Sequence, residues 1–463
     1  MNIKNIILSF MALGLFWSCA EDDAGYPIAT NRGPVMVAQS FNPSEDISDS
    51  DIIGLVKAFD ADGNALSFSL TANDGDLFEL TSDGQLSLAT GKNLDFETKP
   101  QHSITVTVTD GITNPISNSI TIEVANVIET LFEDPAAFIT EWEVVDEQTL
   151  TIGTNMDYDY DFTVDWGDGS GLEVVTQQNP THEYSTGGNY KVAIKGQFPA
   201  LHMFSADGPS KESLLNVVQW GSQKWQTMER SFIDCSKLTG FTATDTPDLS
   251  EVTSMRSMYS NASSFNGAMG SWNTGNVTTM QTMFAGASSF NQSIGSWDTS
   301  NVMNMRGMFQ DAVSFNQNIG DWNTGNVLAM STMFLGATSF NQNIGSWDMA
   351  QVTDVENMFD GATAFDQNLG GWDVGSVFTM EFMLDNSGMS AANLNATLIG
   401  WSEYVDENEG PKNITVGVDG LSICGPEVVE AIQSLTINHN WALTGELQAE
   451  ADCPEEEEEE ATE

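Results

Sequence analysis

A unit of 25 residues repeats without any change in length between Met255 and Met383, and this regularity restricts the possible folds more than any other feature. Valine, methionine, phenylalanine and tryptophan recur at fixed positions in each unit. The tryptophans are Trp272, Trp297, Trp322, Trp347 and Trp372. A unit this short cannot enclose a core alone, so its apolar face must be buried against neighbouring units. The repeats therefore predict a solenoid in which each unit forms one coil.

Each coil is predicted to contain a turn of helix and a short strand. The apolar residues of V-x-x-M-x-x-M-F are spaced as on a helical turn, and the segment S-F-N-Q-N-I-G-S-W is expected to be the strand. Amide side chains also recur in register. They are Asn266, Asn291, Asn316 and Asn341, with Gln292, Gln317, Gln342 and Gln367. We expect them to be buried, to form ladders between coils and to have a structural role.

The repeat consensus M-F-x-x-A-x-S-F-N-Q-x-I-G-x-W-D-T-S-N-V resembles that of the BspA-like leucine-rich-repeat surface proteins. The resemblance extends from about Met228 to Trp401 and implies a leucine-rich-repeat-like solenoid on a bacterial surface. We assign residues 210–390 to this solenoid and its N-terminal cap. In the cap, Trp220 and Trp225 are expected to cover the open apolar end of the first coil.

The N-terminus reads as an export signal. Residues 1–18 contain an apolar run from Ile6 to Trp17 that is too short to span a bilayer. The sequence Leu-Phe-Trp-Ser-Cys, which ends at Cys19, resembles a bacterial lipobox, and the following AEDD resembles the export tag of surface lipoproteins in Bacteroidetes-type bacteria. These resemblances imply a surface-exposed lipoprotein of the outer membrane, lipidated at Cys19 and tethered through residues 19–30. An ordinary secreted protein is the alternative.

Residues 31–128 contain short runs of alternating apolar and polar residues separated by turn formers, which predicts a β-sandwich. The stretches AFDADGN, NLDFET and VTVTDG resemble those of a cadherin-like domain. This resemblance implies calcium, which prefers six to eight oxygen ligands, at the ends of the sandwich. The implied ligands are Glu45, Asp60, Asp62, Asp95, Glu97 and Asp110. The acidic linker of the family is replaced here by VANVIET, and carboxylates that only cap turns are the alternative.

Residues 129–209 are predicted to form a second β-sandwich. The sequence FTVDWGDGS, followed by THEYSTGGNYKVAIKG, resembles a PKD domain. Asp165 and Asp168 flank a Trp-Gly pair after a β run, so we interpret them as turn residues and not as a catalytic pair. His182 is expected to be a packed or surface histidine.

The repeat period ends after Met383, and residues 391–453 are predicted to form a closing cap that begins with a helix capped by Ser390. An extracellular location permits disulfides. Cys424 and Cys453 are expected to pair, which leaves Cys235 as a buried free thiol in the first coil.

The chain is strongly acidic, with 14 Lys and Arg against 66 Asp and Glu and a net charge of −52. This charge argues against nucleic acid and anionic membrane surfaces as partners, so membrane contact is expected only through the lipid anchor. Tolerance of salty surroundings is an equally open reading of the acidity. Residues 454–463 are expected to form a solvated acidic tail.

No hydrolase, zincin, Walker or dinucleotide-binding motif occurs, and the four histidines are not spaced as metal ligands, so we do not expect an enzyme. The sequence predicts a mainly β surface protein for adhesion or protein interaction, with the β domains as a calcium-stabilised stalk. Its partner is an extracellular protein or glycan. A glycan-capture lipoprotein of a polysaccharide-utilisation system is the alternative, and a hydrolase is a third, less supported one.

Partner binding is assigned to one outward position of the solenoid. Its residues are Arg256, Gln281, Arg306, Ser331, Glu356 and Glu381. Side chains that alternate with an apolar stripe are expected to face solvent. We call this set the polar row.

Overall fold

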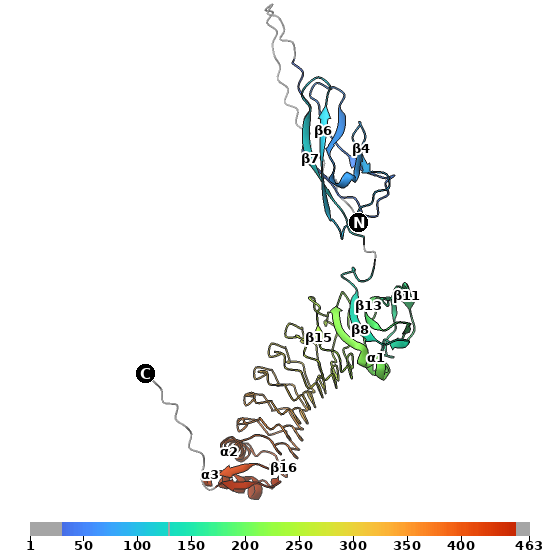
Figure 1. Cartoon of the computed structure of the whole chain (residues 1–463). Helices are drawn as coiled ribbons and strands as arrows, with labels where there is room; N and C mark the ends of the chain where they lie inside the picture. The colour runs from blue at the N-terminus through green and yellow to red at the C-terminus, as the bar shows by residue number, and fades with distance from the viewer. Residues whose placement is uncertain (1–29, 128–129, 451–463) are drawn as a thin grey trace, which may run out of the picture. The chain divides into compact units, whose positions relative to one another are not determined.

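The computed structural model describes residues 30–127 and 130–450 (Figure 1). The chain divides into two compact units after Ile128, and each is considered by itself. The signal peptide, Cys19, the tether, Cys453 and the acidic tail lie outside the described residues, so the predictions made for them remain predictions. Within the described ranges, no helix combines the length and the apolar character needed to cross a membrane.

The described part of the first unit is a β-sandwich. One sheet has the order β1 (Gln39–Phe41), β7 (Ile116–Glu123), β6 (Gln101–Thr109), β3 (Ser67–Ala72), and the other the order β2 (Ile52–Leu55), β5 (Gln85–Leu88), β4 (Phe78–Leu80). A single turn of 3-10 helix, η1 (Asp74–Asp76), joins β3 to β4. Alternate residues of β6 are buried, and Val106 packs with Ile120 and Leu86 in one core. The predicted mainly β sandwich is confirmed here.

The second unit begins with a six-stranded sheet. Its order is β11 (Leu172–Val175), β10 (Asp161–Asp165), β13 (Gly188–Gln197), β8 (Phe138–Val144), β14 (Leu214–Gln219), β15 (Gly240–Phe241). A separate pair is formed by β9 (Gln148–Thr151) and β12 (Thr181–Tyr184), and η2 (Met203–Ser205) and α1 (Gly208–Ser213) precede β14. β14 belongs to the segment expected to cap the solenoid, yet it pairs antiparallel with β8. The sheet therefore continues across the predicted boundary between residues 209 and 210.

The sheet and the repeats share one hydrophobic core, which extends from Phe138 to Trp441. Trp220 and Trp225 are buried, as expected for a cap. The ring of Trp220 lies 5.8 Å from that of Phe138 in the sheet and 5.4 Å from that of Trp272 in the first regular coil. These contacts join the two parts into a single packed body.

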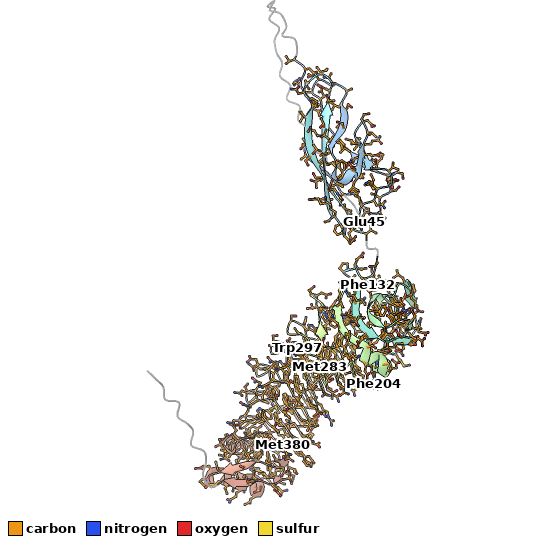
Figure 2. All side chains as sticks on the ribbon, viewed as in Figure 1. Glu45, Phe132, Phe204, Met283, Trp297 and Met380 are labelled. Atoms are coloured by element: carbon orange, nitrogen blue, oxygen red, sulfur yellow. The ribbon has the colours of Figure 1, made fainter. Side chains whose placement is uncertain are left out.

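The repeats stack as successive coils, and we call residues 226–390 the coil stack (Figure 1). Single parallel β-bridges connect residues 25 positions apart. They link Ser254, Thr279, Asn304, Ala329, Asp354 and Thr379 in succession. The rings of Trp297 and Trp322 are stacked with their centroids 6.4 Å apart. Met283, Trp297 and Met380, labelled in Figure 2, are all buried, so the periodic residues form the core as predicted.

The predicted helical turn and short strand do not form in the described coils. The segment around Ser257 is a series of turns, and Ser257 itself has a φ of 53°. The same position in the next coil, Thr282, has a φ of 50°. A residue in the left-handed conformation cannot continue a right-handed helix, and alternate backbone N–H groups here donate to the adjacent coil. Met255 N–H, for example, donates to the carbonyl oxygen of Thr279 at 3.0 Å.

The predicted amide ladders form, but the asparagines are exposed and not buried. Asn266 Oδ1 accepts hydrogen bonds from the Asn291 backbone N–H and from Gln292 Nε2, both at 3.0 Å. The pattern repeats in each following coil, as when Asn291 Oδ1 accepts from Asn316 N–H at 3.0 Å. A side-chain oxygen thus accepts the hydrogen bond that a backbone carbonyl oxygen would accept in the predicted strand. The ladder runs along an open edge of the coils, which explains its exposure.

The C-terminal segment continues the stack. Its elements are α2 (Ala391–Asn408), β16 (Thr415–Gly417), β17 (Ser422–Cys424), α3 (Pro426–Gln433), the π-helical η3 (Ser434–Asn438), β18 (Ala442–Thr444) and β19 (Gln448–Glu450). Ser390 caps α2 as predicted, by accepting a hydrogen bond from Asn393 N–H. Val416 then forms a parallel bridge with Met380, so the ladder resumes after the helix. Parallel pairing of β16 with β18 and of β17 with β19 extends it.

Candidate functional site

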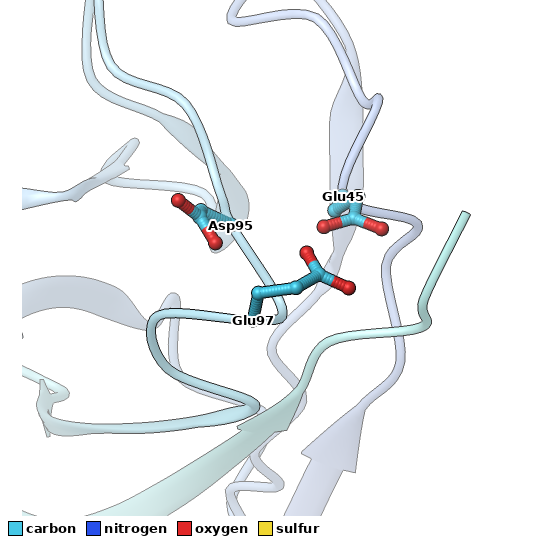
Figure 3. A group of neighbouring side chains, drawn as sticks. All are labelled: Glu45, Asp95 and Glu97. Atoms are coloured by element: carbon cyan, nitrogen blue, oxygen red, sulfur yellow. The ribbon is translucent and has the colours of Figure 1, made fainter. Parts of the chain in front are cut away.

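Three of the predicted calcium ligands, Glu45, Asp95 and Glu97, form one group in the first unit (Figure 3). Glu45 follows β1, and the other two lie in the loop between β5 and β6. One oxygen from each residue lies within 4.8 Å of the others. Glu45 is buried, whereas Asp95 and Glu97 are exposed. We call these three residues the carboxylate group.

Neutral donors hold the carboxylate group in place. Glu45 Oε2 accepts from the backbone N–H of Phe96 at 2.7 Å, and Glu97 Oε1 accepts from Asn126 Nδ2 at 2.8 Å. The backbone N–H and the hydroxyl of Thr98 donate to Asp95 and lower the pKa of its carboxyl group. Within residues 30–127, no ion pair involves any of the three carboxylates. Three negative charges thus lie close together without a cationic side chain, which fits a hard cation such as calcium.

The other three predicted ligands, Asp60, Asp62 and Asp110, form a second group near the start of the described chain. Asp110 Oδ2 accepts from Asn31 Nδ2 at 2.6 Å, and Asp62 Oδ1 lies 3.4 Å from Arg32 Nη2. Hydrogen bonds from the backbone of Thr113 and Ile112 are the main cause that lowers the pKa of Asp110 to about 2. The six predicted ligands are therefore divided between two groups.

Among the described residues, the oxygens of the second group do not all lie within 4.8 Å of one another as those of the carboxylate group do, and only Asp60 gives a sign of cation binding. Its carboxylate is buried, and Oδ1 accepts from the backbone N–H groups of Asp62 and Asn64. Its Oδ2 is buried and has no hydrogen-bond partner among the described residues. A buried carboxylate oxygen without a partner is energetically costly, and a bound cation would compensate it. Arg32 already neutralises part of the charge here, so the carboxylate group is the better candidate.

The Asp165 and Asp168 pair has the structural role that the sequence predicts. Asp165 Oδ1 accepts from Gly167 N–H at 2.9 Å, and Asp168 Oδ1 accepts from Ser170 N–H at 3.0 Å, which closes the turn between β10 and β11. His182 Nε2 lies 2.7 Å from Asp168 Oδ2, and its ring stacks on that of Trp166. Burial raises the pKa of Asp168, but the hydrogen bonds from Ser170 and His182 outweigh it and lower the value to about 2.

Five of the six residues of the polar row reach solvent. Arg256, Arg306 and Glu381 are exposed, and Gln281 and Glu356 are half-buried. The prediction is wrong for Ser331, which is 1% exposed. Its side chain is the shortest in the row and lies between the longer ones of Arg306 and Glu356 in the adjacent coils. Arg256 is partly neutralised, because its Nη1 lies 3.9 Å from Glu229 Oε1.

Sequence reasoning missed a second set of exposed side chains on the coil stack. Met303, Leu328 and Phe378 are 46%, 46% and 70% exposed, and they occupy the same repeat position, with Thr353 between the last two. Backbone hydrogen bonds join them from coil to coil, as from Leu328 N–H to Met303 O at 2.9 Å. We call these three residues the apolar row. The available signal was that a position directly after the buried valine carries large apolar residues in some repeats and threonine in others.

The apolar row leads to a pocket at the C-terminal end of the stack. The pocket has a volume of about 460 Å³, and Phe378 lies against it together with Pro411, Lys412 and Ile414. An exposed aromatic ring beside a concave surface is a typical anchor point for a partner.

The comparisons with known proteins agree with the division into a sandwich and a coil stack. Residues 39–125 match the cadherin domain family, and residues 226–327 and 293–401 match the family described as Mycoplasma protein of unknown function, DUF285. The first unit is thus cadherin-like. No curated protein matches the sequence.

Among solved structures, the chain is similar to human protocadherin-24 EC1-2, at 16% identity, with 33% of this chain and 62% of that chain covered and a TM-score of 0.21. It is also similar to Drosophila N-cadherin EC1-3, at 23% identity, with 21% of this chain and 35% of that chain covered and a TM-score of 0.20. The chain thus spans less than two thirds of the length of either structure.

Proposed function

We propose that this chain is an extracellular adhesion or protein-interaction protein whose coil stack binds another protein. The cadherin-like first unit supports an extracellular role in adhesion or protein interaction. The observation that carries the proposal is the apolar row. The coil stack buries its periodic Trp, Phe and Met residues, yet it leaves Met303, Leu328 and Phe378 exposed in one line.

The charge of the coil stack defines the chemistry of the partner. Residues 251–390 contain twelve Asp and Glu but only Arg256 and Arg306 as cations. The partner surface that fits has apolar side chains for the apolar row and lysine or arginine around them. Opposite charges accelerate association, and the buried apolar contacts then provide most of the affinity.

Binding of the purified chain to an array of extracellular proteins tests this proposal. Leu328→Ser with Phe378→Ser is expected to weaken binding to the captured protein at least tenfold without a change in melting temperature. Phe382→Ser is the matched control, because Phe382 is 48% exposed and occupies a different repeat position. Equal binding by the double variant and the parent chain would refute the apolar row as the contact surface.

The polar row is the second candidate surface, because Arg306 has no ion pair among residues 130–450. The double variant Arg256→Glu with Arg306→Glu distinguishes the two candidates. If the polar row contacts the partner through its cations, reversal weakens binding several-fold. If the apolar row contacts a cationic partner, reversal leaves binding equal or stronger, since it adds negative charge to the stack.

Attachment to the bacterial outer membrane through a lipid on Cys19 is part of the proposal. The apolar run that ends at the Leu-Phe-Trp-Ser-Cys sequence supports it. Cys19→Ser is expected to abolish incorporation of labelled fatty acid and to release the protein from the membrane fraction. A wild-type chain that is exported but carries no lipid would contradict the anchor and leave the binding role intact.

We further propose that calcium binds the carboxylate group and stiffens the first unit. Glu45, Asp95 and Glu97 would supply carboxylate oxygens, and the neutral donors on Phe96, Thr98 and Asn126 fix their orientation. A bound cation would supply the positive charge that the described side chains around this group do not.

A further inference from the structure

An open cleft of about 640 Å³ lies where the six-stranded sheet meets the first coil. Its walls come from three segments far apart in the sequence: residues 157–159 before β10, residues 196–199 at and after the end of β13, and residues 222–226 after β14. The volume is within the roughly 300–1,000 Å³ of sites for small organic ligands. Nothing in the adhesive role proposed above uses this cleft.

The walls of the cleft are held rigidly. Phe198 lines the second wall, and Trp225 lies in the chain between the lining residues Lys224 and Gln226; the rings of Phe198 and Trp225 pack in the core with centroids 6.1 Å apart. Gln197 Nε2 also donates to the backbone oxygen of Asp159 at 3.1 Å, which joins the first two walls. A site preformed in this way loses little entropy when a ligand binds.

Amide and carboxylate side chains line the cleft. Gln223 is 5% exposed, and the one hydrogen bond of its side chain within residues 130–450 is a long contact of 3.5 Å from Nε2 to Ile194 O. Such a contact is weak, so this buried amide can still donate and accept hydrogen bonds with a ligand. Asp157 and Asp159 lie exposed on the first wall, and neither forms an ion pair with a described residue.

Between the two carboxylates lies Tyr158, a half-buried aromatic residue that packs against the core. Burial, together with the charges of Asp157 and Glu229, raises the pKa of its hydroxyl group, so the phenol stays protonated. The cleft thus combines the half-buried ring of Tyr158 with two carboxylates, several amides and the cationic Lys224.

We propose that this cleft binds a neutral sugar unit of a glycan. The carboxylates of Asp157 and Asp159 accept hydrogen bonds from neighbouring hydroxyl groups, and the amide of Gln223 both donates and accepts. The ring of Tyr158 provides a surface for the apolar C–H face of a pyranose. A cationic ligand would also be attracted by the two carboxylates, but Lys224 on the third wall opposes it.

Calorimetric titration of the full chain with neutral hexasaccharides tests the proposal. The probes are cellohexaose, laminarihexaose, maltohexaose and chitohexaose, with spermidine as the cationic comparison. At least one hexasaccharide is expected to bind, and Tyr158→Ala and Asp159→Asn are each expected to weaken that binding at least tenfold. Phe204→Ala is the matched control, because Phe204 is an exposed aromatic residue of the same unit that does not line the cleft.

The outcomes separate this site from the adhesive surface. Gln223→Leu, which keeps the volume of the buried side chain, is expected to reduce sugar binding with an unchanged circular dichroism spectrum. If this variant does not fold, Asp159→Asn at an exposed position gives the decision alone. Leu328→Ser with Phe378→Ser is expected to leave sugar binding unchanged. Binding of spermidine only, of none of the hexasaccharides, or of a hexasaccharide equally by the Tyr158→Ala variant would overturn the proposal.

Discussion

At the residue scale, residues in the left-handed backbone conformation determine the course of each coil. One such position is occupied by Asn261, Gly286, Asp311, Gly336, Gly361 and Asn386, all with positive φ. Glycine, asparagine and aspartate tolerate this conformation best, so the sequence did carry a signal for a turn here. The second position holds Ser257, Thr282, Gly307, Thr332, Asn357 and Phe382. Its mixed composition gives no such signal, which is why the apolar spacing alone suggested a helix.

Thr332→Gly is expected to stabilise the chain. Thr332 has a φ of 56°, an unfavourable conformation for a β-branched residue, and its side chain forms no hydrogen bond with a described residue. Relief of the strain is worth about 1–2 kcal/mol, and the greater freedom of glycine in the unfolded chain takes back about 0.5–1 kcal/mol. Urea unfolding measures the net gain.

Thr253→Gly is the control for this prediction. Thr253 is exposed and has no positive φ, so glycine there adds only its entropic cost of about 0.5–1 kcal/mol and lowers stability. A loss of stability in both variants would show that the left-handed position is not strained.

At the scale of elements, the amide ladder ends where Asp366 replaces the expected asparagine. Its backbone N–H still follows the ladder, because it donates to Asn341 Oδ1 at 2.9 Å. Its Oδ1, however, accepts from the backbone N–H of Ser390, from the Ser390 hydroxyl and from Asn393 Nδ2, all at 2.7–2.8 Å. Ser390 and Asn393 lie at the start of α2, so the negative charge of the Asp366 carboxylate interacts favourably with the positive end of the helix dipole. The acidic substitution thus marks the transition from coil to helix.

Asp366→Asn is expected to destabilise the second unit by about 1–2 kcal/mol, because it removes a charge-assisted acceptor at the start of α2. Asn316→Asp is the matched control. Asn316 Oδ1 accepts from Asn341 N–H and Gln342 Nε2 inside the ladder, where no helix begins, and either residue type supplies that oxygen. Thermal unfolding of both variants checks the difference. Equal losses would mean that the helix dipole has no part in the choice of aspartate.

The loop that carries the carboxylate group is expected to respond to calcium. Binding to the native state alone stabilises by about 2.7 kcal/mol at a hundredfold excess over Kd. Asp95→Asn with Glu97→Gln should abolish the rise in melting temperature between chelator and calcium. Asp60→Asn with Asp62→Asn tests the second group separately and should retain the rise. The calcium proposal fails if the parent chain melts at the same temperature in both conditions.

Sequence reasoning succeeded where a signal is periodic and failed where it depends on distant pairing. The 25-residue period correctly predicted the stacking and the buried tryptophans, because the same contact is made in every coil. The cadherin-like loops correctly brought Glu45 to Asp95 and Glu97. In contrast, β14 pairs with β8, whose residues lie about seventy positions earlier, and no local pattern reveals that partner. The cleft lined by Tyr158 and Gln223 depends on this pairing, so the sequence could not predict it.

At the scale of the whole molecule, the shared core makes the sheet and the coil stack one cooperative body, while residues 30–127 have a core of their own. We therefore expect two unfolding transitions. The cadherin-like unit gives one, and residues from the sheet to β19 give the other.

Two perturbations are expected to act on different transitions. Trp322→Ala removes a buried side chain and the hydrogen bond from its Nε1 to Ile294 O, which costs about 3–5 kcal/mol and should shift only the transition of the second unit. Calcium should shift only the other transition. Trp322→Phe separates packing from hydrogen bonding, since it keeps most of the ring contacts but leaves the Ile294 oxygen with the Trp297 backbone N–H as its donor, at a cost of about 0.5–1.5 kcal/mol for the lost bond. Differential scanning calorimetry resolves the two heat-capacity peaks. A single peak that responds to both calcium and Trp322→Ala would show that the two cores unfold together, in which case calcium in the cadherin-like unit would also stabilise the binding surface of the coil stack.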